Sequence, residues 1–233
     1  MAKIITNWGT LNMDNNLELA RFNMIQQQIR PWDVLDERVL DAMATLARET
    51  FVPDAYRGLA YADIEVPISA TTAMLAPRVV GRLLQALAVQ PADRVLEIGT
   101  GTGYVTACLN RLGGHVVSIE IDPDLAAAAR ERLTASGFKG IDVRDGDGLA
   151  GSSAGGPFNV IAVTGSMPTD AALPRLQEQL TTGGRLFAVI GEIPAMAAIL
   201  ITRLSAQSFR RETLFETTVP VLEQVMEPEG FVF

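Results

Sequence analysis

One short stretch, residues 95–104 (VLEIGTGTGY), constrains the fold of this 233-residue chain more than any other. Val95, Leu96 and Ile98 form an apolar run typical of a buried parallel strand. Three alternating glycines end that run, and the apolar residues 105–109 then predict the start of a helix. Strand, glycine turn and helix open a nucleotide-binding βαβ unit, in which backbone lacking Cβ atoms can approach a ligand closely. The stretch therefore predicts an α/β fold with a nucleotide-like ligand at this turn.

The segments after the glycine turn alternate between strand and helix patterns. Strands are expected at residues 116–120, 140–143, 158–163, 185–190 and 198–204, with at least one more within 209–221, and helices at 123–133 and 173–180. Such alternation is typical of a doubly wound, mostly parallel, Rossmann-like sheet.

About ninety mostly helical residues precede the first strand of this sheet. Residues 19–29 have apolar positions at helical spacing (Leu19, Phe22, Ile25 and Ile29), Asp36 is a candidate helix N-cap, and Pro77 suits a first helical turn. Residues 1–18 are polar, without a clear period, and are expected to form a flexible arm. We therefore predict a single domain at 19–233, divided into a helical extension with a hydroxyl-rich loop (19–90) and a ligand-binding core (91–233).

Charge and composition exclude several classes of function. The chain has a net charge of −8 and only one compact basic run, Arg210–Arg211, so it should repel the phosphate backbone of nucleic acids. No apolar run is long enough to cross a bilayer, and no secretory signal is visible. One cysteine excludes an intrachain disulfide, and one cysteine with one histidine excludes a His/Cys metal site or a His-based triad. We expect a cytoplasmic protein without a bound metal.

Acidic residues and small polar residues close the predicted parallel strands, where ligands bind in sheets of this type. Glu120 ends a strand about 20 residues after Gly99, the position from which an acid can bind both ribose hydroxyls of a nucleoside. Asp147 could accept a hydrogen bond from an adenine amino group, and Glu97 could balance a cationic group of the ligand. Each feature alone could be a plain turn or a solvated charge, but their occurrence in order at successive strand ends favours one binding site.

The spacing G-x-G-x-G with Glu97 before the first glycine resembles the first motif of S-adenosylmethionine (SAM) dependent methyltransferases. The implied cofactor is SAM, and the predicted cofactor-binding residues are Glu97, Gly99, Thr100, Gly101, Gly103, Tyr104, Glu120, Ile121, Gly146, Asp147, Gly148 and Thr164.

Over about residues 24–222 the chain further resembles the protein-L-isoaspartate O-methyltransferases. The segments that carry this resemblance are residues 24–30 (MIQQQIR), 36–43 (DERVLDAM), 51–53 (FVP), 60–63 (AYAD), 66–68 (VPI), 95–104, 118–120 (SIE), 146–148 (GDG), 158–164, 183–186 (GGRL) and 219–221 (VPV). The resemblance implies methyl transfer from SAM to the α-carboxylate of an altered aspartyl residue, the first step in repairing isomerised proteins. The implied partner is a protein or peptide with such residues, or a small carboxylate.

The chain departs from the family pattern in one loop. After residues 66–68 the family usually has Gly-x-Thr-x-Ser-x-Pro, whose hydroxyls contact the substrate carboxylate. With Pro77 as the register, Ala73 stands at the Thr position and Leu75 at the Ser position, and Leu75 cannot hydrogen bond a carboxylate. The nearby hydroxyls of Ser69, Thr71 and Thr72 are the candidate substitutes, although their residue types also suit ordinary turn chemistry.

Three functions stay open at this level. The first is a working carboxyl methyltransferase, for which no general base is needed because a carboxylate is already ionised at neutral pH. The second is a SAM-binding member of the family that has lost isoaspartyl activity and serves as an interaction or sensing module. The third is a methyltransferase for a small apolar substrate, with Met74 and Leu75 lining its pocket.

Overall fold

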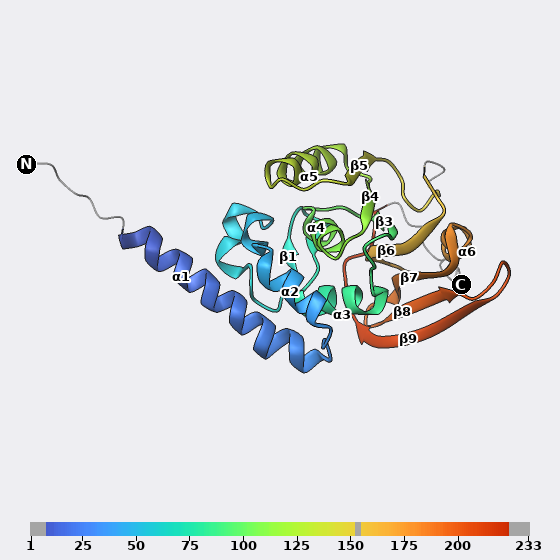
Figure 1. The fold of residues 1–233 in the computed structure, drawn as a ribbon, viewed down its shortest axis with the longest axis horizontal. Helices are drawn as coiled ribbons and strands as arrows, with labels where there is room; N and C mark the ends of the chain where they lie inside the picture. The colour runs from blue at the N-terminus through green and yellow to red at the C-terminus, as the bar shows by residue number, and fades with distance from the viewer. Residues whose placement is uncertain (1–7, 152–154, 224–233) are drawn as a thin grey trace, which may run out of the picture.

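A seven-stranded sheet forms the centre of the computed structural model, which describes residues 8–151 and 155–223 (Figure 1). Its strand order is β5-β4-β3-β6-β7-β8-β9. The strands are β3 (Arg94–Ile98), β4 (His115–Glu120), β5 (Ile141–Asp145), β6 (Phe158–Met167), β7 (Leu180–Glu192), β8 (Ala195–Arg203) and β9 (Phe209–Thr217). The strands from β5 to β7 are parallel, and β8 is antiparallel to both of its neighbours. The expected doubly wound, mostly parallel sheet is confirmed.

Helices cover both faces of the sheet, and the alternation of side chains along each strand separates two parts of the core. Val95 packs in the cluster that includes α2 (Glu37–Thr45), α3 (Pro77–Leu87), α4 (Tyr104–Arg111) and residues of α5 (Pro123–Ala135). Its neighbour Leu96 packs in the other cluster, with α6 (Leu173–Glu178). Each central strand is apolar on both faces, as expected for a parallel sheet that helices cover on both sides.

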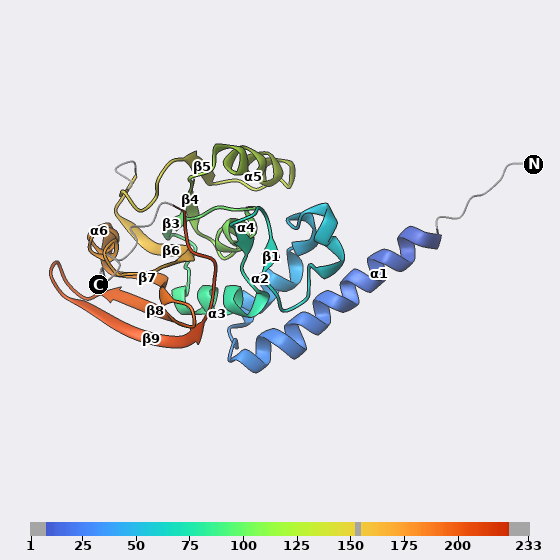
Figure 2. The same ribbon diagram turned by 180° about the vertical axis from the view of Figure 1, so that it is seen from behind.

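The N-terminal part is helical, and it differs from the sequence-based expectation. α1 (Trp8–Asn23) continues into the π-helix η1 (Met24–Ile29) and the 3-10 helix η2 (Arg30–Trp32), so no break occurs at residue 18. Ile25 and Ile29 are buried, but Leu19 and Phe22 are 58% and 60% exposed. The helical conformation predicted for residues 19–29 is confirmed, but only part of the apolar spacing is buried, because α1 extends away from the body of the protein (Figures 1 and 2). Residues 1–7 of the expected arm lie outside the described residues.

A short hairpin follows the 3-10 helices η3 (Arg48–Thr50) and η4 (Asp54–Leu59). β1 (Val66–Pro67) pairs with β2 (Ala73–Met74) in an antiparallel register that places Pro67 opposite Ala73. The hairpin turn contains the hydroxyl-rich residues of the loop. It therefore carries this loop to the edge of the sheet where the glycine turn lies.

Two helices begin as the sequence predicts. The Asp36 side chain accepts a hydrogen bond of 2.8 Å from the backbone N–H of Arg38 at the start of α2. Pro77 occupies the first turn of α3, where a backbone N–H would have no helical partner. Within residues 8–151 and 155–223, no helix is long and apolar enough to cross a membrane.

Replacing Asp36 with Ala should lower the free energy of unfolding by about 1 kcal/mol, because the first turn of α2 loses its capping acceptor. Urea unfolding at pH 7 measures this change. Asp41 is exposed on the same helix, so Asp41→Ala is the control and should change stability by less than about 0.5 kcal/mol. Equal effects of the two substitutions would contradict the capping role.

Candidate functional site

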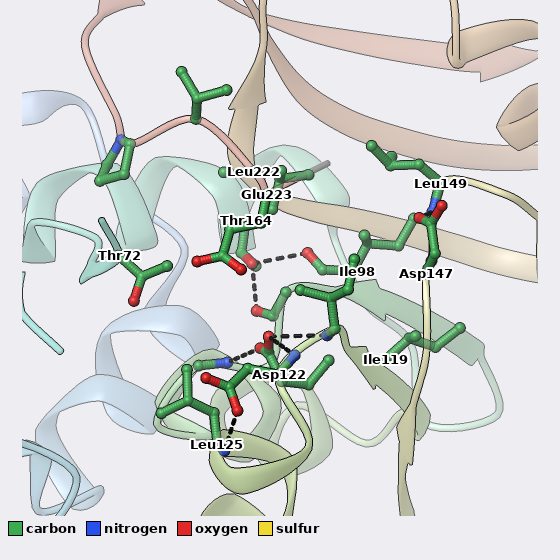
Figure 3. Close-up of a pocket in the computed structure, with 18 of the residues that line it drawn as sticks. Thr72, Ile98, Ile119, Asp122, Leu125, Asp147, Leu149, Thr164, Leu222 and Glu223 are labelled. Carbon is green, nitrogen blue, oxygen red and sulfur yellow. Dashed lines mark hydrogen bonds between the residues drawn. The ribbon is translucent and has the colours of Figure 1, made fainter. Parts of the chain in front are cut away.

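An open cleft of about 710 Å³ lies at the carboxyl ends of the parallel strands. β3 lies between β4 and β6. From β3 the strand order runs to β4 and β5 on one side and to β6 and β7 on the other, so β3 marks the switch point at which ligands bind in sheets of this kind. Residues that line the cleft include Ile68, Thr72, Ala73, Gly99, Gly101, Glu120, Ile121, Asp122, Gly146, Asp147, Gly148, Thr164 and residues 220–223 (Figure 3).

The glycine turn after β3 forms one wall of this cleft. Gly99 and Gly101 have φ angles of +92° and +53°, which side-chain-bearing residues rarely adopt. A Cβ atom on Gly99 would lie 2.6 Å from Oγ1 of Thr164 on β6. That hydroxyl lies 2.5 Å from the carbonyl oxygen of Gly99 and 2.9 Å from that of Ile98, and its one proton is shared between them, so it holds the turn against the neighbouring strand. Close packing and backbone conformation both require glycine here.

The carboxylate of Glu120 connects the glycine turn to the end of β4. Its Oε2 accepts from the backbone N–H of Gly101 at 2.7 Å, and its Oε1 accepts from those of Ile121 (2.9 Å) and Asp122 (3.2 Å). Three backbone donors therefore fix a side chain that is only 6% exposed but still lines the cleft. Each carboxylate oxygen has two lone pairs, so three of the four acceptor positions are used and Oε2 keeps one for a hydroxyl donor of a ligand.

Asp147 lines the opposite side of the cleft from Thr72 (Figure 3). Its Oδ1 accepts from the backbone N–H groups of Leu149 (2.9 Å) and Ala150 (3.3 Å), which is ordinary turn chemistry. The turn interpretation and the binding interpretation of this residue are therefore compatible. Gly148 has a structural reason to be glycine, because a Cβ atom there would lie 2.8 Å from Cγ2 of Ile98.

Four of the predicted cofactor-binding residues do not line this cleft: Glu97, Thr100, Gly103 and Tyr104. Gly103 packs instead against α5, where an added Cβ would lie 3.2 Å from Cδ1 of Leu133. Thr100 and Tyr104 line a second, adjoining cleft. Sequence position alone could not separate residues that face the main cleft from residues that support the turn beneath it.

Glu97 is fully buried next to the glycine turn. Its Oε2 accepts from the hydroxyls of Thr106 (2.5 Å) and Ser118 (2.6 Å), and the Ser118 hydroxyl lies 2.6 Å from that of Thr100. Oε1 has no hydrogen-bond partner among the described residues. Burial raises the pKa of Glu97 to about 7, although the two hydroxyls oppose the shift, and the nearby Glu120 adds to it. This carboxyl group can therefore change its charge near neutral pH.

The second cleft encloses about 320 Å³ between the glycine turn and the hairpin. It shares Ile68, Ala73, Gly99, Gly101 and Thr164 with the large cleft, so the two spaces adjoin at these residues. Its remaining lining residues are Arg48, Met74, Leu75, Val80, Thr100, Thr102, Tyr104 and Val105.

The three candidate hydroxyls of the hairpin loop mostly bond within the loop. The Ser69 hydroxyl accepts from the backbone N–H groups of Thr71 (3.2 Å) and Thr72 (3.1 Å) and lies 2.7 Å from the Thr72 hydroxyl. The Thr71 hydroxyl donates to Glu223 at 2.9 Å. Of the three residues only Thr72 lines the large cleft. These contacts agree with the turn chemistry that the residue types suggest.

Residues 220–223 form one wall of the cleft, which was not predicted from the sequence. The backbone N–H of Ser166 donates to Pro220 O (2.8 Å), and that of Leu222 donates to Ser166 O (3.0 Å), so β6 holds this segment in place. The signal was present, since residues 219–221 belong to the segments that carry the family resemblance. Their distance in sequence from the glycine turn concealed their role.

Comparisons with known proteins agree with this geometry. The family model for protein-L-isoaspartate(D-aspartate) O-methyltransferase matches residues 20–224. The chain belongs to this family. A protein-L-isoaspartate O-methyltransferase of Koribacter versatilis is 42% identical over 196 residues, which cover 84% of this chain and 87% of that protein. One from Rhodopseudomonas palustris is 39% identical over 214 residues, covering 89% and 97%.

Solved structures show the same fold. A protein-L-isoaspartate O-methyltransferase structure has a TM-score of 0.76 at 24% identity, covering 87% of this chain and 65% of that one. A Plasmodium falciparum structure in complex with S-adenosyl-L-homocysteine (SAH) has a TM-score of 0.74 at 19% identity, covering 89% and 98%. As a member of the protein-L-isoaspartate(D-aspartate) O-methyltransferase family, the protein is a SAM-dependent methyltransferase, as predicted.

The residues of the large cleft fit a nucleoside cofactor. Glu120 offers a remaining acceptor position on its fixed Oε2, and the glycines of the turn allow close approach because they carry no Cβ atoms. The unpartnered Oε1 of Glu97 adds a buried acceptor next to the same turn. SAM has the complementary groups, namely a ribose diol and two cationic centres.

Replacing Glu97 with Gln should remove part of the pH dependence of stability. Folding raises the pKa of Glu97 from its ordinary value near 4.5 to about 7, so the native state binds this proton more tightly than the unfolded chain does. The free energy of unfolding should therefore fall as the pH rises from about 4.5 to 7, by on the order of 1–3 kcal/mol from this group. Urea unfolding at pH 5 and pH 7.5 gives the difference between wild type and variant.

The exposed Glu131 on α5 provides a control for this measurement. Glu131→Gln should keep the wild-type pH dependence. The assignment fails if the Glu97→Gln variant loses stability between the two pH values as steeply as the wild type.

Proposed function

We propose that this protein transfers the methyl group of SAM to the α-carboxylate of altered aspartyl residues in proteins and peptides. One observation carries the proposal: a large cleft suited to a nucleoside and a smaller cleft beside the family's substrate loop meet at Gly99, Gly101 and Thr164. A methyl donor in the first cleft and an acceptor in the second would come together at this junction. Family membership supplies the substrate class.

We assign Glu120 to the ribose hydroxyls and Asp147 to the adenine amino group. Support comes from their places on the cleft wall and from the backbone donors that fix the orientation of both carboxylates. The glycine turn would lie against the amino-acid part of the cofactor. Glu97 would act from beneath the turn, since a cation nearby favours the ionised form of a buried carboxyl group.

The reaction requires mainly positioning. SAM supplies the methyl group, and the acceptor carboxylate is already ionised at neutral pH, so the protein needs no general base. What the chain must provide is an in-line arrangement of carboxylate oxygen, methyl carbon and sulfur. The two adjoining clefts suit this task. The single histidine, His115, lies at the start of β4, at the other end of the strand from Glu120, and has no part in it. We place the reaction in the cytoplasm, a reducing compartment that suits the single buried thiol of Cys108.

The replacement of Glu120 by Ala should weaken SAH binding about ten- to a hundredfold, because charge-assisted hydrogen bonds to the ribose are lost. Calorimetric titration with SAH measures the effect without requiring catalysis. Glu120→Gln keeps one acceptor and should bind with intermediate affinity. The exposed Glu131→Ala is the control and should bind as the wild type does. Unchanged affinity in Glu120→Ala would rule out the ribose assignment.

A second function is favoured by one observation in the loop. Leu75, which stands at the position of the family's loop serine, is 5% exposed and lines the smaller cleft, where it would desolvate a carboxylate rather than bind it. The alternative is thus a SAM-binding member of the family that has lost isoaspartyl activity. It would serve as an interaction or sensing module, or it would methylate a different small substrate. In the second case Met74 and Leu75 would contact an apolar acceptor.

A labelled-methyl assay separates the two. With saturating labelled SAM and an isoaspartyl peptide, the proposed enzyme should form a base-labile methyl ester, while the same peptide with ordinary aspartate should remain unlabelled. Absence of label, in a protein that binds SAH, would favour the alternative. In that case Leu75→Ser combined with Ala73→Thr should restore labelling if the loop alone is responsible.

A further inference from the structure

Arg48 is a buried cation that no acidic group of the described residues pairs with. The side chain is 0% exposed, and none of the described carboxylates comes within ion-pair distance of it. Its Nε donates to the carbonyl oxygen of Ala60 (2.9 Å), and its Nη2 donates to that of Leu75 (2.8 Å). Nη1 has no partner within hydrogen-bond distance among the described residues; the hydroxyl of Tyr104, which also lacks a partner there, is close enough to oppose the lowering of the pKa of Arg48. A buried charge in such surroundings is costly unless an anion accompanies it.

This guanidinium lies where the two halves of the site meet. Arg48 begins η3, and its Cζ atom lies 4.7 Å from the ring centre of Tyr104, the first residue of α4 after the glycine turn. The hydrogen bond to Leu75 joins it to the substrate loop. Arg48, Leu75 and Tyr104 all line the smaller cleft. The unpartnered donor therefore belongs to a residue of the cleft wall.

The surroundings leave few other groups that could recognise an anion. Among the described side chains that line the smaller cleft, Arg48 is the one cation, and the other polar groups are the hydroxyls of Thr100, Thr102, Thr164 and Tyr104. Burial lowers the pKa of Arg48 from its ordinary value, but a guanidinium remains charged at neutral pH. Its planar fork of donors is suited to a carboxylate.

We propose that Nη1 of Arg48 donates a hydrogen bond to the carboxylate of the methyl acceptor and holds it at the junction of the two clefts. This inference rests on the proposed function, and it names the group that replaces the loop hydroxyls missing at Ala73 and Leu75. Arg48 would thus be a substrate-binding residue in the wall of the smaller cleft.

The methyl transfer itself would weaken the contact between Arg48 and the acceptor. A carboxylate oxygen forms a bond to the methyl carbon with its own electron pair, the carbon–sulfur bond breaks, and that pair stays on sulfur, so no proton moves. The acceptor loses its negative charge as it becomes an ester. Its attraction to the guanidinium falls accordingly, so the product leaves more readily than the substrate.

The test measures how Arg48 discriminates a charged ligand from a neutral one. An isoaspartyl peptide and its methyl ester are titrated by calorimetry into the SAH-saturated wild-type protein and into the Arg48→Met variant. The wild type should bind the carboxylate about ten- to a hundredfold more tightly than the ester, the range expected for a hydrogen bond between charged groups. In Arg48→Met the ratio should fall below about threefold. Arg111→Met, at an exposed position at the end of α4, should keep the wild-type ratio.

Two results would overturn the proposal. If Arg48→Met weakens both peptides equally, the residue only supports the loop through the carbonyl of Leu75. If it weakens SAH binding while the ratio persists, the guanidinium binds the carboxylate of the cofactor instead. Should Arg48→Met fail to give the wild-type circular dichroism spectrum, Arg48→Lys replaces it. That variant keeps the positive charge but lacks the planar guanidinium donors. Its ratio of affinities for the carboxylate and the ester should lie between the wild-type ratio and one, and a wild-type ratio in Arg48→Lys would contradict the proposal.

The labelled-methyl assay distinguishes a failure of this inference from a failure of the proposed function. If the wild type forms the methyl ester but the Arg48 substitution does not change the ratio of affinities, the proposed function is supported and the role of Arg48 is wrong. A ratio that depends on Arg48, without methyl transfer, would leave the binding site standing and remove the activity.

Discussion

The hydrogen bonds of the Glu120 carboxylate are the interaction on which the rest of the site depends. One oxygen holds the glycine turn that follows β3, and the other holds the first two backbone N–H groups after β4. Two adjacent parallel strands therefore end in a fixed relation to each other. The remaining walls, Thr164 on β6 and Asp147 after β5, are built outward from this pair of strands. A single buried acid thus determines the shape of the cofactor cleft as well as contributing to its surface.

The core and the cofactor cleft could be predicted from the sequence because their signals are local. Apolar runs, glycine spacing and capping residues such as Asp36 each lie within a few positions of the structure they specify. The strand-end residues Glu120, Asp147 and Thr164 were predicted to meet by one topological rule, and the structure brings them to one cleft. The depth of each side chain was not predictable. Glu97 and Gly99 are two positions apart, yet one is enclosed beneath the turn and the other lines the cleft.

Features that rest on contacts distant in sequence were missed. The sequence around Arg48 predicts only the end of a helix. The contacts that suggest a role for Arg48 are with Ala60, Leu75 and Tyr104, which lie 12 to 56 positions away in the sequence. The part of α1 before residue 19 was missed for a different reason. Its apolar residues follow no single stripe, because the helix extends past the body of the protein and needs no continuous buried face (Figure 2).

The segment at residues 220–223 has a consequence for how the protein is made. It is the last described part of the chain, and it returns from β9 to β6 to close one side of the cofactor cleft. A nascent chain that has folded only through β9 already has all seven strands of the sheet but lacks this wall. Stabilisation by bound ligand acts only on a state that binds it. The cofactor cleft is therefore complete only after residue 223 has left the ribosome, and the full stabilisation by bound cofactor follows that point.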